Sequence, residues 1–319
     1  MILSSILVDN ILTAPVIAFV VALIATLLRF DLRIPDALYP ILSTFLLLAI
    51  GIKGGKALSE SSPSELWQPL LAAIAIGVIT PLIAYALFRK TAKLDITNAA
   101  ALAAHYGSVS AVTFTVLLST LDSQGIAYEG FVSGLLAVLE IVGIVVALFL
   151  AHKFSAGTDW KSGLSEVVRG KSIAFLVAGL LIGVIVGPDR LTPTVSLFVG
   201  LFSGALTLFL IELGAIAANR LRDFNGAGIR VVVLAIVVPL INGSIGAVLG
   251  SAAGMSVGGV AVMATLAASA SYIAAPAAIR IALPEASPGI YVTASLGITF
   301  PFNLIIGIPL YIKIAEYLG

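Results

Sequence analysis

The sequence predicts an all-α integral membrane protein of about ten transmembrane helices, built as two inverted five-helix repeats in which helices 4 and 9 are broken. Three observations predict this fold class: high hydrophobicity, apolar runs of membrane-spanning length, and a match between the two halves of the chain. Of the 319 residues, 60% are apolar and only 10% are charged, and the mean hydropathy is +1.15. Soluble domains carry about 25% charged residues, so we expect most of this surface to face lipid.

Apolar runs between polar breaks define the candidate spans. A spanning helix needs about 20 residues, and ten runs approach or exceed this length. They cover residues 11–28, 38–52, 66–88, 96–119, 128–151, 171–188, 195–214, 228–250, 256–280 and 288–315. The longest polar connection, 152–170, is expected to be a central cytoplasmic linker. It divides the chain into a first repeat, 1–151, and a second repeat, 171–319.

Basic residues are unevenly distributed between the two sides of the membrane that these spans define. One side holds four of the 17 Lys and Arg residues, namely Lys53, Lys56, Arg190 and Lys313, and the other side holds the remaining thirteen. Cytoplasmic loops are enriched in Lys and Arg. We therefore predict that the richer side is cytoplasmic and that both termini are outside.

The two halves of the chain align at a constant offset of 163 residues. The matched pairs are Gly51 with Gly214, Leu58 with Leu221, Ser108 with Ser271, Asp122 with Glu285, Tyr128 with Tyr291, Gly134 with Gly297, and Glu140 with Asn303. Each half holds an odd number of spans, so the second copy enters the membrane from the opposite face. Inverted repeats of this kind are typical of secondary transporters, which favours a carrier over a channel or a receptor.

Spans 4 and 9 occupy matching repeat positions, and both are interrupted near the middle of the membrane. In span 4 the interruption is Gly107-Ser108-Val109-Ser110. In span 9 it is Ser269-Ala270-Ser271, followed by Pro276, which is expected to free a carbonyl further up the helix. Interrupted backbone at this depth is tolerated only where protein or a watery cavity satisfies it. The two segments are therefore expected to line a common site.

These interruptions suit a small oxyanion. The N-terminus of a half-helix offers unpaired N–H groups and a partial positive charge, and serine hydroxyls can donate further hydrogen bonds. Neither segment carries Lys or Arg at its centre, so an anion would be held by dipoles and hydroxyls. The alternative is that Ser, Ala and Gly here only allow close packing between helices.

Ionisable and amide side chains inside the spans indicate a coupling cation. Glu140 lies at the middle of span 5, where a carboxylate is costly, and its repeat partner is Asn303. Both carry hard oxygen ligands, which makes Na+ the candidate. The alternative is a protonated or hydrogen-bonded structural Glu140. His105 is either a proton carrier or a buried structural histidine, and Glu212 is expected to be structural.

Other polar residues and motifs limit the range of functions. Asp122 and Glu285, in turns, and Asp95, which is expected to cap span 4, are interpreted as structural. The chain has no Cys, which excludes thiolate metal sites. Its net charge is only +1, so it has no strong positive field that would attract nucleic acid. No phosphate loop, zinc spacing or nucleophile elbow occurs. We therefore expect no enzyme and no cofactor apart from a coupling ion.

The sequence resembles the sodium-dependent bicarbonate permeases best known from cyanobacteria. The similarity runs through YGSVSAVTFTVLLSTLDSQGIAYEGF and LAASASYIAAPAAIRIALPEASPGIY, with a weaker match that includes LLLAIGIKGGKAL. The resemblance implies Na+-driven bicarbonate uptake across the inner (plasma) membrane by a homotrimer. It places spans 1, 2, 6 and 7 in a gate and spans 3–5 and 8–10 in a mobile core. It also places the ligands near Ser108, Ser110, Thr113, Ser269 and Ser271.

The chain differs from the cyanobacterial pattern in two places. Those relatives share a Ser-Ser-Ser-Asp-Ile-Ser run where this chain has Ser269-Ala270-Ser271-Tyr272-Ile273-Ala274, which removes an acidic residue and two hydroxyls. They also have a longer central loop and respond to a PII-like signalling protein. The short segment 152–170 does not favour that partner here.

The function expected from these features is Na+-coupled symport of bicarbonate. Its site residues are Gly107, Ser108, Ser110, Thr113, Ser269 and Ser271 for the anion, and Glu140 and Asn303 for the cation. The alternatives are Na+-coupled uptake of another small anion, or cation/proton exchange through His105 and Glu140. A non-transporting membrane sensor or scaffold is the alternative from another class.

Overall fold

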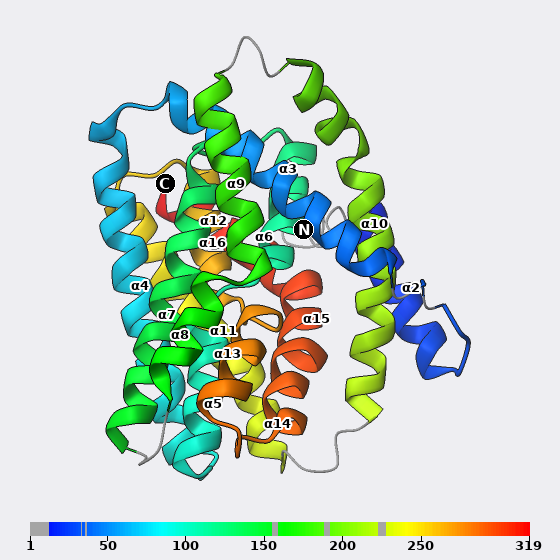
Figure 1. The fold of residues 1–319 in the computed structure, drawn as a ribbon, viewed down its shortest axis with the longest axis vertical. Coiled ribbons are helices and arrows are strands. Elements are labelled where there is room, and N and C mark those ends of the chain that lie inside the picture. Colours follow the sequence, from blue (N-terminus) through cyan, green and yellow to red (C-terminus); the bar gives the residue numbers. More distant parts are fainter. Residues whose placement is uncertain (1–12, 33, 36, 155–158, 188–191, 223–227) are drawn as a thin grey trace.

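Every regular element that the structure describes is a helix (Figure 1). The structure is a computed structural model that describes residues 13–32, 34–35, 37–154, 159–187, 192–222 and 228–319. The helices of the first half are α2 (Ala14–Leu27), α3 (Leu38–Glu60), α4 (Pro63–Lys90), α5 (Ile96–Gly107), α6 (Ala111–Gln124) and α7 (Val132–Phe154). The second half begins with α8 (Trp160–Val168), α9 (Lys171–Val186), α10 (Thr192–Arg222), α11 (Gly228–Ala252), α12 (Val257–Ala268) and α13 (Ala274–Ala282).

The last membrane segment combines α-helical and π-helical turns. It consists of α14 (Pro288–Val292), η1 (Thr293–Thr299), α15 (Phe300–Phe302), η2 (Asn303–Gly307) and α16 (Ile308–Leu318). Apolar runs do not reveal such turns, because hydropathy is the same for either hydrogen-bonding pattern. π-Helical turns within α-helices are frequently found at functional sites.

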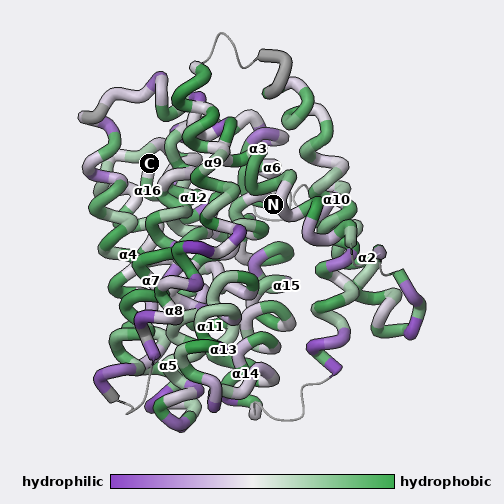
Figure 2. Tube along the Cα trace, in the orientation of Figure 1, coloured by the Kyte–Doolittle hydropathy of each residue, from purple (hydrophilic) through white to green (hydrophobic). Residues whose placement is uncertain are grey.

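The chain is a multi-pass membrane protein by the length and composition of its helices. Among the described residues, seven helical segments can cross a membrane, or eight if α8 and α9, bent by 43°, form one span; α2 and α12 are shorter apolar helices. Hydrophobic residues run along most of α4 and α9 (Figure 2). Each of the ten predicted spans overlaps a helix, but the ten-span inverted repeat stays a prediction. Arg33 and Arg190, which were used for the orientation, lie outside the described residues, as do residues 1–12.

Two helices extend beyond their predicted ends. α3 continues from the predicted end at 52 to Glu60, and α10 continues from 214 to Arg222. Charged residues follow both apolar runs, Lys53 and Lys56 the first and Arg220 and Arg222 the second, yet Lys and Arg are good helix formers. The helices therefore continue where the hydrophobicity stops.

The central linker contains the amphipathic helix α8. Its first turn is capped by Asp159, whose carboxylate accepts a hydrogen bond from the Ser162 N–H at 3.1 Å. α8 packs on α7 and α13, and an added Cβ at Gly163 would lie 3.3 Å from the Ala278 carbonyl oxygen. The linker is therefore partly folded onto the rest of the protein.

Glycines allow two pairs of helices to pack with their backbones in contact. A Cβ on Gly51 of α3 would lie 2.5 Å from the Leu176 carbonyl oxygen of α9, and a Cβ on Gly214 of α10 would lie 2.4 Å from the Phe19 carbonyl oxygen of α2. Gly179 on α9 contacts α3 in the same way. Together with the packing of α3 on α10, these contacts join α2, α3, α9 and α10 into one group.

Candidate functional site

The first interruption lies between α5 and α6. α5 ends at Gly107, Ser108 and Val109 are extended, and Ser110 is the N-cap of α6. The Ser110 hydroxyl accepts a hydrogen bond from the Thr113 N–H at 3.2 Å. The predicted break in span 4 is therefore present, and a serine rather than a proline ends it by capping the second half-helix. The predicted cap of α5 is also confirmed, since Asp95 accepts from the Asn98 N–H at 2.8 Å.

The second interruption lies between α12 and α13 and covers Ser269–Ile273. The Ser271 hydroxyl accepts a hydrogen bond from the Ala275 N–H at 3.2 Å. The role expected for Pro276 is wrong: this proline lies in the first turn of α13, where its missing N–H needs no helical partner. It favours the start of a new helix and does not free a carbonyl within an existing one.

The two interruptions are in direct contact. The Ser110 N–H donates to the Ser269 hydroxyl at 2.9 Å, and the Ser271 N–H donates to the His105 carbonyl at 2.8 Å. Ser108, Ser110, Thr113, Ser269 and Ser271 are all buried, and none is more than 4% exposed. Residues that are about 160 positions apart in the sequence therefore share one buried polar region.

The hydroxyls of this region differ in how fully they are used. The Ser269 hydroxyl donates to the Leu266 carbonyl at 2.8 Å and also accepts from Ser110. Those of Ser110 and Ser271 act as helix caps. In contrast, the Ser108 hydroxyl has no hydrogen-bond partner among the described residues. A buried polar group without a partner is costly, so Ser108 is the serine of this region most suited to bind a ligand.

α7 packs directly against the first interruption. A Cβ on Gly143 would lie 1.8 Å from the Gly107 carbonyl oxygen and 2.8 Å from the Ser108 nitrogen. Glu140 lies three residues before Gly143 and therefore on the same face of α7. The sequence predicted Gly107 and Glu140 as site residues, but it did not predict that Gly143 contacts the first interruption.

Glu140 is buried without a counterion. It is 4% exposed, its Oε2 atom has no hydrogen-bond partner, and neither ion pair of the described residues involves it. A buried carboxylate without a partner costs several kcal/mol. Glu140 therefore requires either a proton or a bound cation. No cluster of three or more His, Cys, Asp or Glu occurs in the described ranges, so hydroxyl and carbonyl oxygens would supply the other ligands.

Asn303 braces the second interruption. Its Nδ2 donates to the carbonyl of Ala268, the last residue of α12, at 2.9 Å, and its Oδ1 accepts from the Tyr311 hydroxyl at 3.4 Å. The structure thus places Asn303 beside a break. Its amide is already engaged with protein groups, unlike the carboxylate of Glu140.

Two other buried ionisable residues have different surroundings. The Nδ1 atom of His105 lies 2.7 Å from the Ala101 carbonyl oxygen, while its Nε2 has no partner in the part of the chain that the structure describes. The carboxylate of Glu212 accepts a hydrogen bond from the Ile34 N–H at 3.0 Å, as suits its expected structural role.

A further polar connection, missed from the sequence, links three helical segments behind the breaks. The Thr299 hydroxyl donates to the Ala235 carbonyl of α11 at 2.6 Å and lies 2.7 Å from the Tyr106 hydroxyl of α5. Pro239 lies four residues after Ala235 and has no N–H, so that carbonyl lacks its usual helical donor. Pro239 was the signal in the sequence.

Thr299→Val is expected to destabilise the protein, because two buried polar groups lose a partner, each at a cost of about 1–3 kcal/mol. Thr80→Val is the matched control, since the buried Thr80 hydroxyl only bonds back to Ile76 in its own helix. The measurement is Tm of the purified protein in detergent. Equal Tm values for the two variants would contradict this role for Thr299.

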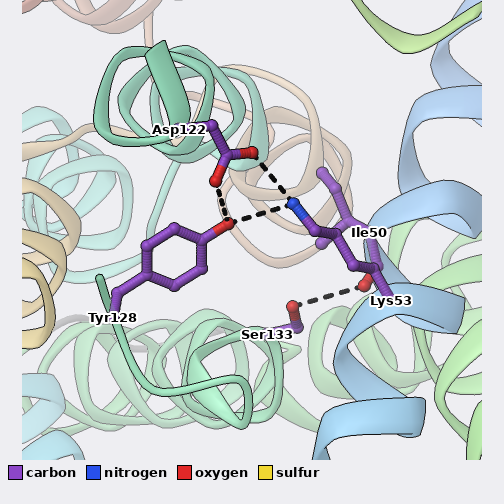
Figure 3. A network of polar contacts seen from close by, with 5 residues as sticks. All are labelled: Ile50, Lys53, Asp122, Tyr128 and Ser133. Carbon is purple, nitrogen blue, oxygen red and sulfur yellow. Dashed lines mark hydrogen bonds and ion pairs between the residues drawn. The ribbon is translucent and has the colours of Figure 1, made fainter. Parts of the chain in front are cut away.

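A cavity of about 610 Å³ lies between α3, α10, α6 and the start of α7. Lys53 of α3 lines it, and its Nζ lies 2.9 Å from Asp122 Oδ2 and donates to the Tyr128 hydroxyl at 3.1 Å (Figure 3). The Tyr128 hydroxyl in turn donates to Asp122 Oδ1 at 2.9 Å. Burial, opposed by the charge of Lys53, raises the pKa of Tyr128, so the phenol keeps its proton at neutral pH.

The cavity does not reach the breaks. A second void of only about 20 Å³ lies beside them and is lined by Ala111, Val112 and Ile273, among others. Ile50 on α3 lines both spaces. Ile50 therefore lies between the large cavity and the small void beside the breaks.

Comparison with known families identifies the class of this protein. Residues 14–316 match the Na+-dependent bicarbonate transporter superfamily. The chain belongs to this superfamily. As a member of the Na+-dependent bicarbonate transporter superfamily it is a multi-pass membrane transporter, which agrees with the resemblance seen in the two interrupted segments. Among curated proteins, no individual sequence matches the chain significantly.

Proposed function

We propose that the chain is a secondary transporter that couples the movement of bicarbonate to that of Na+, as a symporter of the cytoplasmic membrane. One observation carries this proposal: the two interruptions are hydrogen-bonded to each other, and among the described residues no group bonds to the buried Ser108 hydroxyl, within the first of them, or to Oε2 of Glu140, on the helix that packs against it. An anion and a cation supply what these two groups lack. The superfamily makes bicarbonate and Na+ the first candidates.

The anion is bound between the half-helices. Its oxygens accept from the Ser108 hydroxyl and from backbone N–H groups at the starts of α6 and α13, where helix dipoles favour negative charge. Na+ binds at Glu140 with hydroxyl or carbonyl oxygens of the first interruption. Because each ion reduces the electrostatic cost of burying the other, the two bind together, which is the physical basis of symport.

Movement between two bodies gives the site alternating access. The group formed by α2, α3, α9 and α10 serves as the gate, and the remaining membrane helices form the core that carries both interruptions. The equivalent glycine contacts of Gly51 and Gly214 support two related halves, and the offset of 163 residues pairs these same glycines. Inverted halves allow the core to face either side in turn.

The proposal is tested by uptake of labelled bicarbonate into proteoliposomes, with and without an inward Na+ gradient. Uptake that requires Na+ and is competed weakly by other small anions would support it. Na+-independent uptake would contradict the coupling to Na+, and stronger competition by another anion would identify that anion as the substrate.

The same assay separates the alternative functions. Binding of bicarbonate without flux would favour a sensor. Flux driven by a pH gradient would favour cation/proton exchange, for which the bare Nε2 of His105 is the supporting observation.

Glu140→Gln is expected to raise the Na+ concentration needed for half-maximal uptake by at least about tenfold, because a neutral amide replaces the charged ligand. The substitution preserves size, so folded protein should accumulate. The matched control is Glu212→Gln: Glu212 is also buried, but the oxygen of Gln can still accept from Ile34. An unchanged Na+ dependence in Glu140→Gln would place the cation elsewhere.

A further inference from the structure

The contacts of Lys53 join α3 to Asp122 of α6 and to Tyr128 in the turn before α7, beside the large cavity. On one side, α3 is fixed to α9 by glycines: a Cβ on Gly55 would lie 2.1 Å from the Leu180 carbonyl oxygen, and one on Gly183 would lie 2.5 Å from the Ile52 carbonyl oxygen. On the other side, α3 packs closely on the start of α7, since a Cβ on Gly54 would lie 2.5 Å from Ser133 Cβ and one on Gly130 would lie 1.9 Å from Ala57 Cβ. Lys53 therefore extends from a rigid helix pair to the end of α6, beside the large cavity.

The partners of Lys53 belong to the body that carries the interruptions. Asp122 is near the end of α6, whose first residue follows Ser110. Tyr128 lies in the turn before α7, and this turn is attached to α12, because the Glu129 carboxylate accepts from the Ser256 N–H at 2.6 Å. Displacement of α6, α7 and α12 relative to α3 must therefore break or re-form the contacts of Lys53.

The strength of the Lys53–Asp122 contact suits a reversible connection. Both side chains are about half exposed, at 50% and 52%, and ion pairs with this exposure contribute little to stability and are weakened by salt. One turn before Lys53, the Ile50 carbonyl accepts from the Ser133 hydroxyl of α7 at 3.3 Å (Figure 3). The same face of α3 thus carries the polar contacts and Ile50, which borders both the cavity and the void beside the breaks.

We propose that Lys53, Asp122 and Tyr128 form a latch that holds α3 against the ends of α6 and α7, and so controls opening of the cavity toward the interrupted helices. The inference rests on the proposed function, since it assigns the latch a place in the transport cycle. Lys53 and Asp122 are positioning residues that act through the movement of α3 relative to α6. They need not touch the transported ions.

The absence of cysteine from the sequence makes the latch directly testable. Ser119→Cys places one thiol on α6 in the cavity, and Ser64→Cys places one at the exposed start of α4, away from it. Each is combined with Lys53→Gln, Asp122→Asn, both changes, or the exchange Lys53→Asp with Asp122→Lys. The rate of thiol modification is measured with a cationic and an anionic reagent, so that attraction of the reagent by local charge can be separated from access.

Breaking the latch is expected to raise the rate of modification of the Ser119→Cys thiol about threefold to fivefold with both reagents. An effect of this size suits the loss of a weak ion pair. Either single change should have this effect, the double change should add nothing, and the charge exchange should restore the parent rate. Lys56→Gln, on the same helix and without an ion pair among the described residues, should leave the rate unchanged, as should every variant at Ser64→Cys. The latch would be overturned if the modification rates did not change. It would also be overturned if the effects of Lys53→Gln and Asp122→Asn on the rate were additive in the double variant.

This measurement does not depend on which solute is carried. If bicarbonate uptake fails but the rates change as expected, the latch stands and the proposed substrate falls. If uptake proceeds and the rates are unaltered, the transport function stands without the latch.

Discussion

Replacing Gly143 with alanine is expected to destabilise the protein, although alanine is the better helix former. The new methyl group would lie 1.8 Å from the Gly107 carbonyl oxygen, which is backbone and cannot rotate away. α7 must then move off the first interruption, at a cost of about 1–3 kcal/mol or more. Transport should be lost with it, because displacement of Gly107 also displaces Ser108. Tm and bicarbonate uptake of the purified variant measure the two effects.

Gly134→Ala is the matched control on the same helix. A Cβ at Gly134 meets no atom within 4 Å, so only the helix propensity changes, which favours alanine by about 0.5–1 kcal/mol. The two alanines should therefore change Tm in opposite directions. A Gly143→Ala protein as stable as the parent would show that α7 can shift freely, and that the interruption does not depend on this contact.

Ser108→Ala is expected to raise the KM for bicarbonate by about tenfold to a hundredfold, because a hydrogen bond to a charged ligand contributes about 1.5–3 kcal/mol. Tm should not fall, since the Ser108 hydroxyl has no hydrogen bond to lose to any residue that the structure describes. This separation of binding from stability is the signature of a ligand group. Uptake kinetics and thermal unfolding on the same preparation measure both.

Two other serines provide the controls for Ser108. Ser110→Ala removes the N-cap of α6, so it should cost about 1 kcal/mol of stability. Ser295→Ala removes an equally buried hydroxyl that bonds to the Tyr291 and Val292 carbonyls in its own segment, and should leave KM unchanged. If Ser108→Ala transports with the parent KM, the anion does not bind at this hydroxyl.

Local features of the sequence predicted much of the fold. Hydrophobic runs located the membrane helices, because a membrane-facing helix needs a continuous apolar surface. Asp95 predicted the start of α5 because an N-cap is a short-range interaction. The run Gly107–Ser110 predicted the first interruption for the same reason. The ends of α3 and α10 were missed, since hydropathy indicates where a helix leaves the apolar part of the membrane and not where the helix ends.

The sequence predicted which residues form the candidate site, but not which of their polar groups are hydrogen-bonded to the protein. The serines of both interruptions were identified, whereas only the structure separates the capping hydroxyls of Ser110 and Ser271 from the unpartnered one of Ser108. It also shows Asn303 engaged with α12, and Oε2 of Glu140 without a hydrogen-bond partner within the described part of the chain.

The sequence by itself determined a helical membrane protein with two interrupted segments rich in small and hydroxyl-bearing residues, because hydropathy and capping depend on residues close together in the chain. The repeat predicted that the interruptions share one site, but only the tertiary structure decided which of their atoms bond to each other, that Gly143 lies on Gly107, and that Lys53 reaches Asp122. Each of these depends on atoms from segments at least 36 residues apart, and a local pattern carries no information on which distant groups become neighbours. Hydrogen bonds and close backbone contacts between such groups therefore define the site.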